Sequence, residues 1–78
     1  MKTTAYFKFT RKRADRKEIK DEWIEKAVHF PIREVRQADG RFKRWIQIKE
    51  AGDRYLRIIV LEDGETVHNA FFDRNFKR

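Results

Sequence analysis

Apolar and polar residues alternate along most of the chain from residue 33 onwards, and turn residues interrupt the alternation at intervals. Such alternation is typical of strands that bury one face. Asp39-Gly40 and Asp63-Gly64 are two-residue hairpin signals, because a type I′ turn needs positive φ at both central positions. Ala51-Gly52-Asp53 is a third turn. The pattern therefore predicts an antiparallel meander over residues 33–72, with strands at 33–38, 41–50, 54–62 and 65–72.

The segment ahead of the sheet has a helical period instead. Its apolar stripe consists of Ile19, Trp23, Ala27 and Phe30, with Ile24 and Val28 beside it. Asp15 and Glu18 have the spacing of a capping box, with Asp15 in the cap role. Pro31 ends the segment, because the residue before a proline is disfavoured in the α region. We expect one helix over residues 15–30.

The two ends of the chain are polar and basic. Within the basic segment 1–14, alternation over Thr3–Thr10 predicts a short strand. The tail, 73–78, is polar apart from Phe76. No repeat, linker or composition shift divides the chain, so we expect a single domain over residues 1–78. The expected fold class is α+β, with one main N-terminal helix packed on a four- to five-stranded antiparallel sheet.

Strand pairing decides which residues face the helix. Two-residue turns pair Ala38 with Arg41 and Glu62 with Glu65, and a three-residue loop at 51–53 sets the middle hairpin. A two-residue loop there would move Trp45 under the helix, so we prefer the longer loop, which separates apolar from polar positions. The face predicted against the helix holds Val35, Phe42, Ile46, Ile48, Leu56, Ile58, Val60, Val67 and Phe71, and one polar exception, Asn69.

The opposite face mixes cations, aromatic rings and an imidazole. It is predicted to hold Glu34, Arg36, Lys43, Trp45, Gln47, Tyr55, Arg57, Ile59, His68 and Phe72. A solvated sheet surface is one interpretation, since sheets with one wet face are common. Its apolar side chains form a large patch for a small monomer. We therefore expect a cover, which could be the basic tail, a partner chain such as a second copy in a homodimer, or RNA bases stacked on the rings.

Charge narrows the choice of partner. The chain of 78 residues has 20 Lys and Arg against 13 Asp and Glu, a formal charge of +7. Residues 1–20 hold eight of these cations and two acids, which favours a polyanion such as nucleic acid. There the side chains that would follow phosphates are Arg11, Lys12, Arg13, Arg16 and Lys17.

Other classes of function are excluded or disfavoured. The absence of Cys excludes disulfides and thiol catalysis. The only two histidines, His29 and His68, lie too far apart in the sequence to suggest a metal site. No apolar run approaches the roughly 18 residues of a membrane span, and no signal peptide follows Met1. We expect a cytoplasmic protein that is not bound to a membrane.

Three short strings, together with the order of elements, resemble a known group. They are DGR at 39–41, YLRIIV at 55–60 and ETVHNAFFDR at 65–74. Over roughly residues 9–74 the chain is similar to small bacterial toxins of the BrnT and RelE type and to related small domains. The resemblance implies the α+β fold of barnase-like ribonucleases and metal-independent RNA cleavage without a cofactor. It also implies a small acidic antitoxin as a partner.

Many of the related small domains carry a His ahead of the first helix, and residues 9–14 of this chain contain none. That leaves three alternatives: His68 takes the catalytic role, cationic residues manage the chemistry, or the chain does not cleave RNA. Cleavage through attack by the 2′-OH needs a base, an acid and a cation for the phosphate. For the first alternative we predict His68 as acid or base, Arg57 and Arg74 on the phosphate, and Asp73 as an orienting carboxylate.

The remaining predicted site residues bind rather than react. Arg36, Arg41 and Lys43 are expected on the RNA backbone, and Trp45 or Tyr55 is expected to stack on a base. Two functions compete with a nuclease. One is a non-catalytic RNA- or DNA-binding module, and the other is a protein-interaction module that uses the aromatic sheet face.

Overall fold

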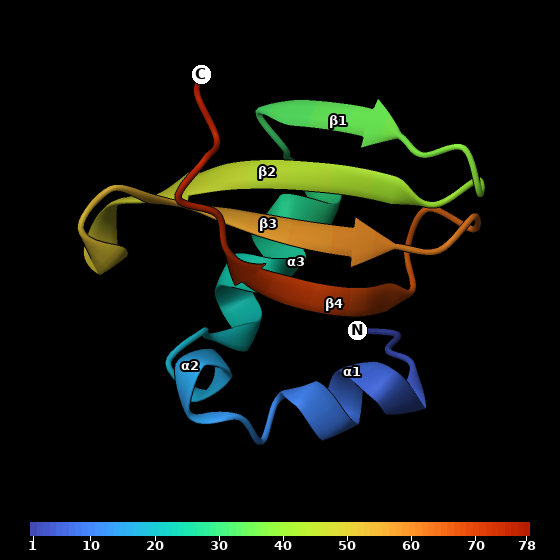
Figure 1. The fold of residues 1–78 in the computed structure, drawn as a ribbon, viewed down its shortest axis with the longest axis horizontal. Coiled ribbons are helices and arrows are strands. Elements are labelled where there is room, and N and C mark those ends of the chain that lie inside the picture. Colours follow the sequence, from blue (N-terminus) through green and yellow to red (C-terminus); the bar gives the residue numbers. More distant parts are fainter.

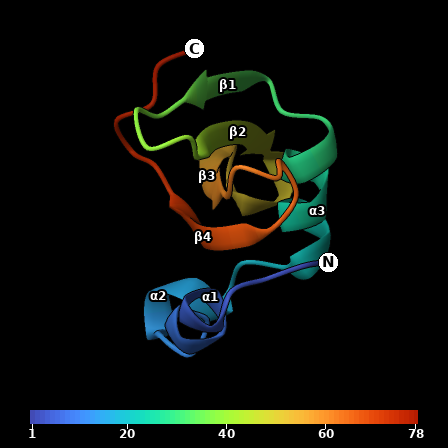
Figure 2. The same ribbon diagram turned by 90° about the vertical axis from the view of Figure 1, so that its right-hand side faces the viewer.

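Three short helices precede a four-stranded sheet in a computed structural model that describes residues 1–78. The elements in chain order are α1 (Ala5–Thr10), α2 (Ala14–Lys17), α3 (Asp21–His29), β1 (Arg33–Arg36), β2 (Phe42–Ile48), the single 3₁₀ turn η1 (Lys49–Ala51), β3 (Arg54–Val60) and β4 (Val67–Phe72). Helix α3 lies behind the sheet in Figure 1, while α1 and α2 lie beside the β4 edge. Figure 2 shows that α3 and the C-terminal segment are on opposite faces of the sheet.

The sheet is the predicted antiparallel meander, with the order β1-β2-β3-β4. The possible fifth strand is reduced to one parallel bridge between Thr3 and Val67. Two hydrogen bonds flank it, from Thr4 N to the Val67 carbonyl at 3.1 Å and from Val67 N to the Lys2 carbonyl at 2.8 Å. The N-terminus is thus fastened to the outer edge of β4.

The strand predicted over Thr3–Thr10 is wrong, because this segment forms α1. Thr4 is the N-cap, and its Oγ1 accepts a hydrogen bond from Phe7 N at 3.1 Å. Phe7 and Thr10, three residues apart, are the buried positions, whereas Phe9 is 65% exposed. A strand would turn Phe7 and Phe9 to the same side, whereas only Phe7 is buried. The N-cap at Thr4 and the burial of Phe7 with Thr10 both favour the helix.

The continuous helix predicted over residues 15–30 is two helices, because the chain is extended at Lys20. The break turns Ile19 into the core, where it is 1% exposed. The Arg11 guanidinium donates to the Ile19 carbonyl at the break. It thereby satisfies an acceptor that the end of α2 leaves free.

The two ends of the predicted helix differ from the observed ones. Helix α3 ends at His29, one residue before the predicted end at Phe30 and, as expected, ahead of Pro31. The capping box is wrong, because Asp15 lies in the first turn of α2 and Arg13 is the N-cap. Phe30 was expected in the apolar stripe but is 74% exposed, since it follows the last helical residue with a different backbone conformation.

The first hairpin has a longer loop than predicted. Residues 37–41 form it, and Arg36 pairs with Phe42. Because this shifts the pairing by one residue, β1 is turned over relative to the prediction. Val35 lies on the face opposite α3, while Glu34 and Arg36 lie on the α3 side.

The middle hairpin also has a five-residue loop, residues 49–53, which includes η1. Gly52 and Asp53 adopt positive φ of 74° and 62° to close it. Ile48 pairs with Arg54, a shift of two residues from the preferred pairing. An even shift leaves every side chain on its predicted face, so the assignment of β2 and β3 to the two faces is confirmed.

A β-bulge interrupts the last hairpin. Val60 pairs with Val67 as predicted, but Ile59 pairs with Asn69, which leaves His68 as the extra residue. The predicted pairing of Glu62 with Glu65, continued along the strands, would place His68 opposite Ile59, and this placement is wrong. Beyond the bulge the faces exchange: Phe71 and Asn69 leave the α3 side, and Ala70 and Phe72 join it. The bulge thus removes the polar exception, Asn69, from the core.

The core lies between the sheet and the helices. Its buried members are Phe7, Ile19, Trp23, Ile24, Ala27, Ile46, Ile48, Leu56, Ile58, Val60, Val67 and Ala70. Trp45 is also buried but lies outside this cluster, on the other side of the sheet. None of the helices is both long and apolar enough to cross a lipid bilayer.

Candidate nucleic-acid interface

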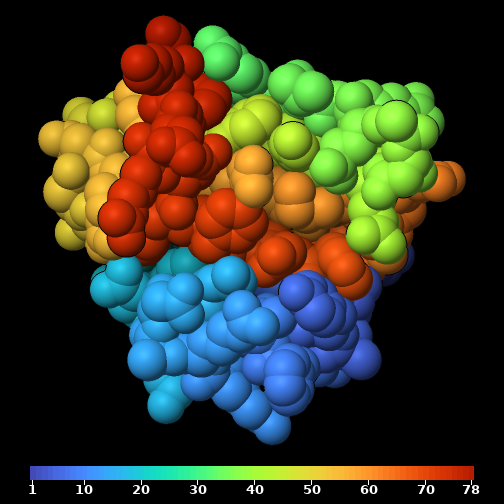
Figure 3. All heavy atoms as spheres, in the orientation of Figure 1, coloured from blue at the N-terminus to red at the C-terminus, as the bar shows by residue number.

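We call the side of the sheet opposite α3 the open face. It is visible in Figure 1 and as a space-filling surface in Figure 3. Strand alternation and the observed pairing place on it Arg33, Val35, Lys43, Trp45, Gln47, Tyr55, Arg57, Ile59, Asn69 and Phe71. Sequence reasoning found the members from β2 and β3. It missed Arg33, Val35, Asn69 and Phe71, because the first loop and the bulge each shift the pairing by one residue.

The tail, residues 73–78, covers one end of the open face. Asp73 N donates to the Tyr55 carbonyl at 2.8 Å, and Trp45 Nε1 donates to Asp73 Oδ2 at 3.0 Å. The Phe76 ring then stacks on Trp45, with 5.1 Å between centroids, and lies 4.8 Å from Tyr55. Figure 3 shows the tail across the sheet, with atoms of the strands uncovered beside it. The tail is therefore one cover for the aromatic patch.

An open hollow of about 720 Å³ lies along the inner side of the tail. We call it the arginine hollow. Its lining consists of Arg33, Trp45, Arg57, Phe71, Phe72, Asp73, Arg74, Asn75, Phe76 and Lys77. Four of these ten side chains are cationic and one is acidic. The hollow thus concentrates positive charge next to aromatic rings, which is the combination that single-stranded nucleic acids need.

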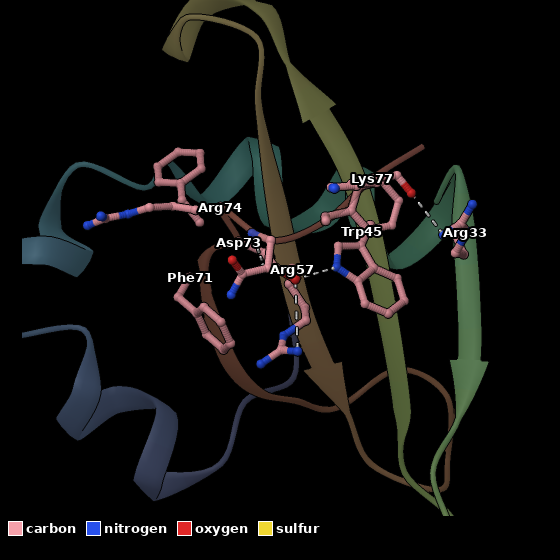
Figure 4. Close-up of a pocket in the computed structure, with 10 residues that line it drawn as sticks. Arg33, Trp45, Arg57, Phe71, Asp73, Arg74 and Lys77 are labelled. Carbon is pink, nitrogen blue, oxygen red and sulfur yellow. Dashed lines mark hydrogen bonds and ion pairs between the residues drawn. The ribbon is translucent and has the colours of Figure 1, made fainter.

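One cation of the hollow, Arg57, has a buried donor that no protein group satisfies. Its Nε is buried without a hydrogen-bond acceptor, and its Nη1 is 3.9 Å from Asp73 Oδ2. The guanidinium lies 4.3 Å from the centre of the Phe71 ring (Figure 4). The Nε leaves one buried donor unsatisfied by the protein. The side chain as a whole is 26% exposed, so the Nη atoms of the guanidinium fork can donate to a phosphate.

Asp73 is placed as an orienting group. Its carboxylate accepts hydrogen bonds from Trp45 Nε1 and from the Asn75 N–H, at 3.0 Å each. The bond from Trp45 holds the pKa of Asp73 below its ordinary value, and Asn75 and the Arg57 charge act in the same direction against burial. Asp73 is consequently a fixed anion that positions Trp45 and Arg57.

A second guanidinium reaches the Phe71 ring from α2. Arg16 lies 5.2 Å from the ring centre and donates to Asn69 Oδ1 at 2.7 Å and to the Ala70 carbonyl at 3.1 Å. Asn69 thus orients a cation on the open face. Unlike Arg57, Arg16 donates hydrogen bonds to acceptors of the protein itself.

The structure does not bring the two central members of the predicted catalytic set together. His68 Nδ1 is hydrogen-bonded to Thr4 Oγ1 at 2.9 Å, and its ring stacks on Tyr6. No hydrogen bond or ion pair joins His68 to Arg57. Arg57 is paired with Phe71 of β4. Phe71 follows His68 by three residues, so the two positions lie about 10 Å apart along the strand. Burial, with the charge of Arg41, lowers the pKa of His68 below its ordinary value.

Arg74 lines the hollow, but its side chain extends away from Arg57 (Figure 4). The pairing of Arg57 with Asp73 is therefore the part of the predicted set that is in contact. No three His, Asp or Glu side chains gather in an arrangement that could hold a metal ion.

The predicted binding cations fall into three groups. Lys43 lies on the open face, and Lys12 and Arg13 are exposed beyond α1. Arg11 forms an ion pair with Asp21 at 2.6 Å, and Arg41 lies 3.9 Å from Asp39. Arg36 lies on the α3 side, because of the longer first loop, with its guanidinium 5.3 Å from the Phe42 ring centre. The positive charge available to a ligand on the open face therefore comes from Lys43 and from the cations of the arginine hollow.

None of the protein-family models, curated proteins or solved structures compared with the chain matches it.

Proposed function

We propose that the protein binds single-stranded RNA on the open face, with a phosphate at Arg57 and bases against the aromatic rings. The single observation that carries the proposal is the Arg57 guanidinium, which lies in the arginine hollow with a buried Nε that no protein group satisfies. Arg33, Arg74 and Lys77 line the same hollow and supply further charge for the backbone. The formal charge of +7 supports an anionic ligand.

The test compares two arginines of equal charge. Binding of a fluorescein-labelled single-stranded RNA decamer is measured by anisotropy for the unsubstituted protein, Arg57→Ala and Arg36→Ala, at several salt concentrations. Arg36 is a matched control, because it carries the same charge and is exposed at the end of β1, on the α3 side of the sheet.

A charged hydrogen bond contributes roughly 1.5–3 kcal/mol, and about 1.4 kcal/mol corresponds to a tenfold change in affinity. Arg57→Ala should therefore weaken binding about tenfold or more and reduce the salt slope by about one, whereas Arg36→Ala should change little. Equal losses for both variants would mean that only net charge matters and would remove Arg57 from the site.

We further propose that the protein has a RelE- or BrnT-like fold, cleaves RNA and is bound by an acidic antitoxin. This proposal rests on the sequence resemblance alone. The same binding mixtures, incubated without metal and resolved on a denaturing gel, test cleavage. Products that disappear in His68→Ala and in Arg57→Ala would support the predicted catalytic set. Binding without products would leave the non-catalytic module as the function.

A further inference from the structure

Phe76 is held by the kinds of group that proteins use to hold an unpaired base. Its ring stacks on Trp45 at an interplanar angle of 26° and contacts Tyr55. The Arg33 guanidinium lies 4.9 Å from its ring centre. Aromatic side chains and an arginine plane together form a common stacking site for single-stranded nucleic acid.

The segment that carries Phe76 is weakly attached to the sheet. The strand-like hydrogen bonding ends at Asp73, whose N–H donates to the Tyr55 carbonyl. Beyond it, one hydrogen bond joins the tail to the sheet, from Arg33 Nη1 to the Lys77 carbonyl at 3.2 Å. Residues 76–78 are thus held mainly by the Phe76 ring, the hydrogen bond from Arg33 and the hydrogen bond of the Phe76 N–H to Asp73. Movement of the ring would not require the bonds that join Asp73 to Tyr55 and Trp45 to break.

Trp45 is only 7% exposed while Phe76 lies on it. A base can therefore stack on Trp45 only after the Phe76 ring has moved. We infer that Trp45 and Tyr55 form a base-stacking subsite that Phe76 fills, so that Phe76 and a nucleobase compete for it. This inference rests on the proposed function, because it assumes that RNA reaches the open face.

The competition has a measurable consequence. A ligand that must displace an internal competitor binds with an affinity reduced by the fraction of protein in which the site is free. Removal of the Phe76 ring should therefore tighten the binding of base-containing RNA. It should not affect a strand that has phosphates and no bases.

The experiment measures binding of two labelled decamers, oligoadenylate RNA and an abasic strand with the same phosphates. The variants are Phe76→Ala, Phe76→Leu and the control Phe30→Ala, whose ring is 74% exposed away from the open face. Circular dichroism checks that each variant is folded. Phe76→Leu keeps an apolar side chain on Trp45 and so guards against a fold defect in Phe76→Ala.

We expect Phe76→Ala to bind oligoadenylate about five- to tenfold more tightly, with Phe76→Leu between it and the unsubstituted protein. The abasic strand and Phe30→Ala should show no change. On the unsubstituted protein, oligoadenylate should abolish the nuclear Overhauser contact between the Phe76 ring and the Trp45 indole.

Two outcomes overturn the inference and leave the proposed function standing. Both require that the unsubstituted protein binds the abasic strand and that Arg57→Ala weakens this binding. In the first, Phe76→Ala binds oligoadenylate with unchanged affinity. In the second, it binds more weakly, which would make Phe76 part of the binding surface. If neither strand binds to any variant, the proposed function fails and the inference fails with it.

Discussion

Arg44 joins three parts of the fold through one guanidinium group. Its Nη1 donates to the Val28 carbonyl at 3.0 Å and to the Gly64 carbonyl at 2.8 Å. Its Nε donates to Glu34 Oε2 at 2.6 Å. The side chain is 12% exposed. Arg44→Ala should therefore loosen the end of α3, strand β1 and the turn between β3 and β4 at the same time.

The size of the effect follows from the partners. A hydrogen bond to a charged group contributes roughly 1.5–3 kcal/mol, and bonds that share one donor group are not additive. The ion pair adds little, because Glu34 is 43% exposed and screened by water. We expect Arg44→Ala to lower the free energy of unfolding by about 2–4 kcal/mol. Proteins of this length have a total of about 4–12 kcal/mol.

Urea unfolding followed by circular dichroism measures this change, and Arg36→Ala is the control. The Arg36 and Arg44 guanidinium groups lie at 5.3 and 5.4 Å from the same Phe42 ring centre, so both variants lose that contact. Only Arg44 also loses hydrogen bonds to backbone carbonyls. A cost within about 0.5 kcal/mol of that of Arg36→Ala would show that these bonds do not stabilise the fold.

Three further outcomes are expected. Because burial lowers the pKa of His68, the unfolded chain binds a proton more readily, so stability should fall as the pH drops below about 6.5. His68→Gln should flatten that fall in urea titrations between pH 7 and 5. Leu56→Ala, at a fully buried position, should cost about 2–5 kcal/mol, and Ile59→Ala on the half-buried open face clearly less. The hydrogen bond from the Thr66 hydroxyl lowers the pKa of Asp63 to about 2, and Thr66→Val should raise it in a carbon-detected NMR titration.

The faces of β2 and β3 could be predicted because apolar residues dominate the α3 side of both strands, although Arg44 lies on that side and Trp45 and Ile59 lie on the other. Ile46, Leu56 and Ile58 are apolar on one side, while Lys43 and Arg57 are polar on the other. An error of two residues in the loop length left these faces unchanged. The sequence pattern of the central strands is thus stronger evidence than the turn that connects them.

The outer strands could not be predicted in this way, since their faces depend on single-residue shifts. A Gly after Asp39 fits both a two-residue turn and the observed five-residue loop, in which Gly40 adopts a φ of 90°. The bulge at His68 left one signal in the sequence, which was the polar Asn69 at a predicted core position. A single polar residue within an apolar face is a reason to test a bulge before assigning a buried amide.

The candidate site was predicted in part for the same reasons. Trp45 and Arg57 lie on the face expected for them, whereas the catalytic pairing of Arg57 with His68 depended on the strand that contains the bulge. A cover for the aromatic patch was expected, and the tail with Phe76 was one of the three alternatives. No pattern in the sequence could choose the tail, because one aromatic residue in a polar segment has no period.

Net charge is a poor guide to the location of a binding surface in this protein, because some of its arginines are hydrogen-bonded within the fold and others are not. Arg11 and Arg16 donate to backbone carbonyls inside their own fold, and Arg44 does the same. These three would contribute to a field that attracts RNA, yet the donors concerned could contact a phosphate only by giving up bonds that hold the helices to one another or to the sheet. Arg57 has no such bond to lose. Cations within one basic protein should therefore be ranked by the protein acceptors that they already have. By this ranking Arg57 comes ahead of Arg11, Arg16 and Arg44 as a candidate phosphate contact, while the exposed Lys12 and Arg13 of the N-terminal segment also stay available.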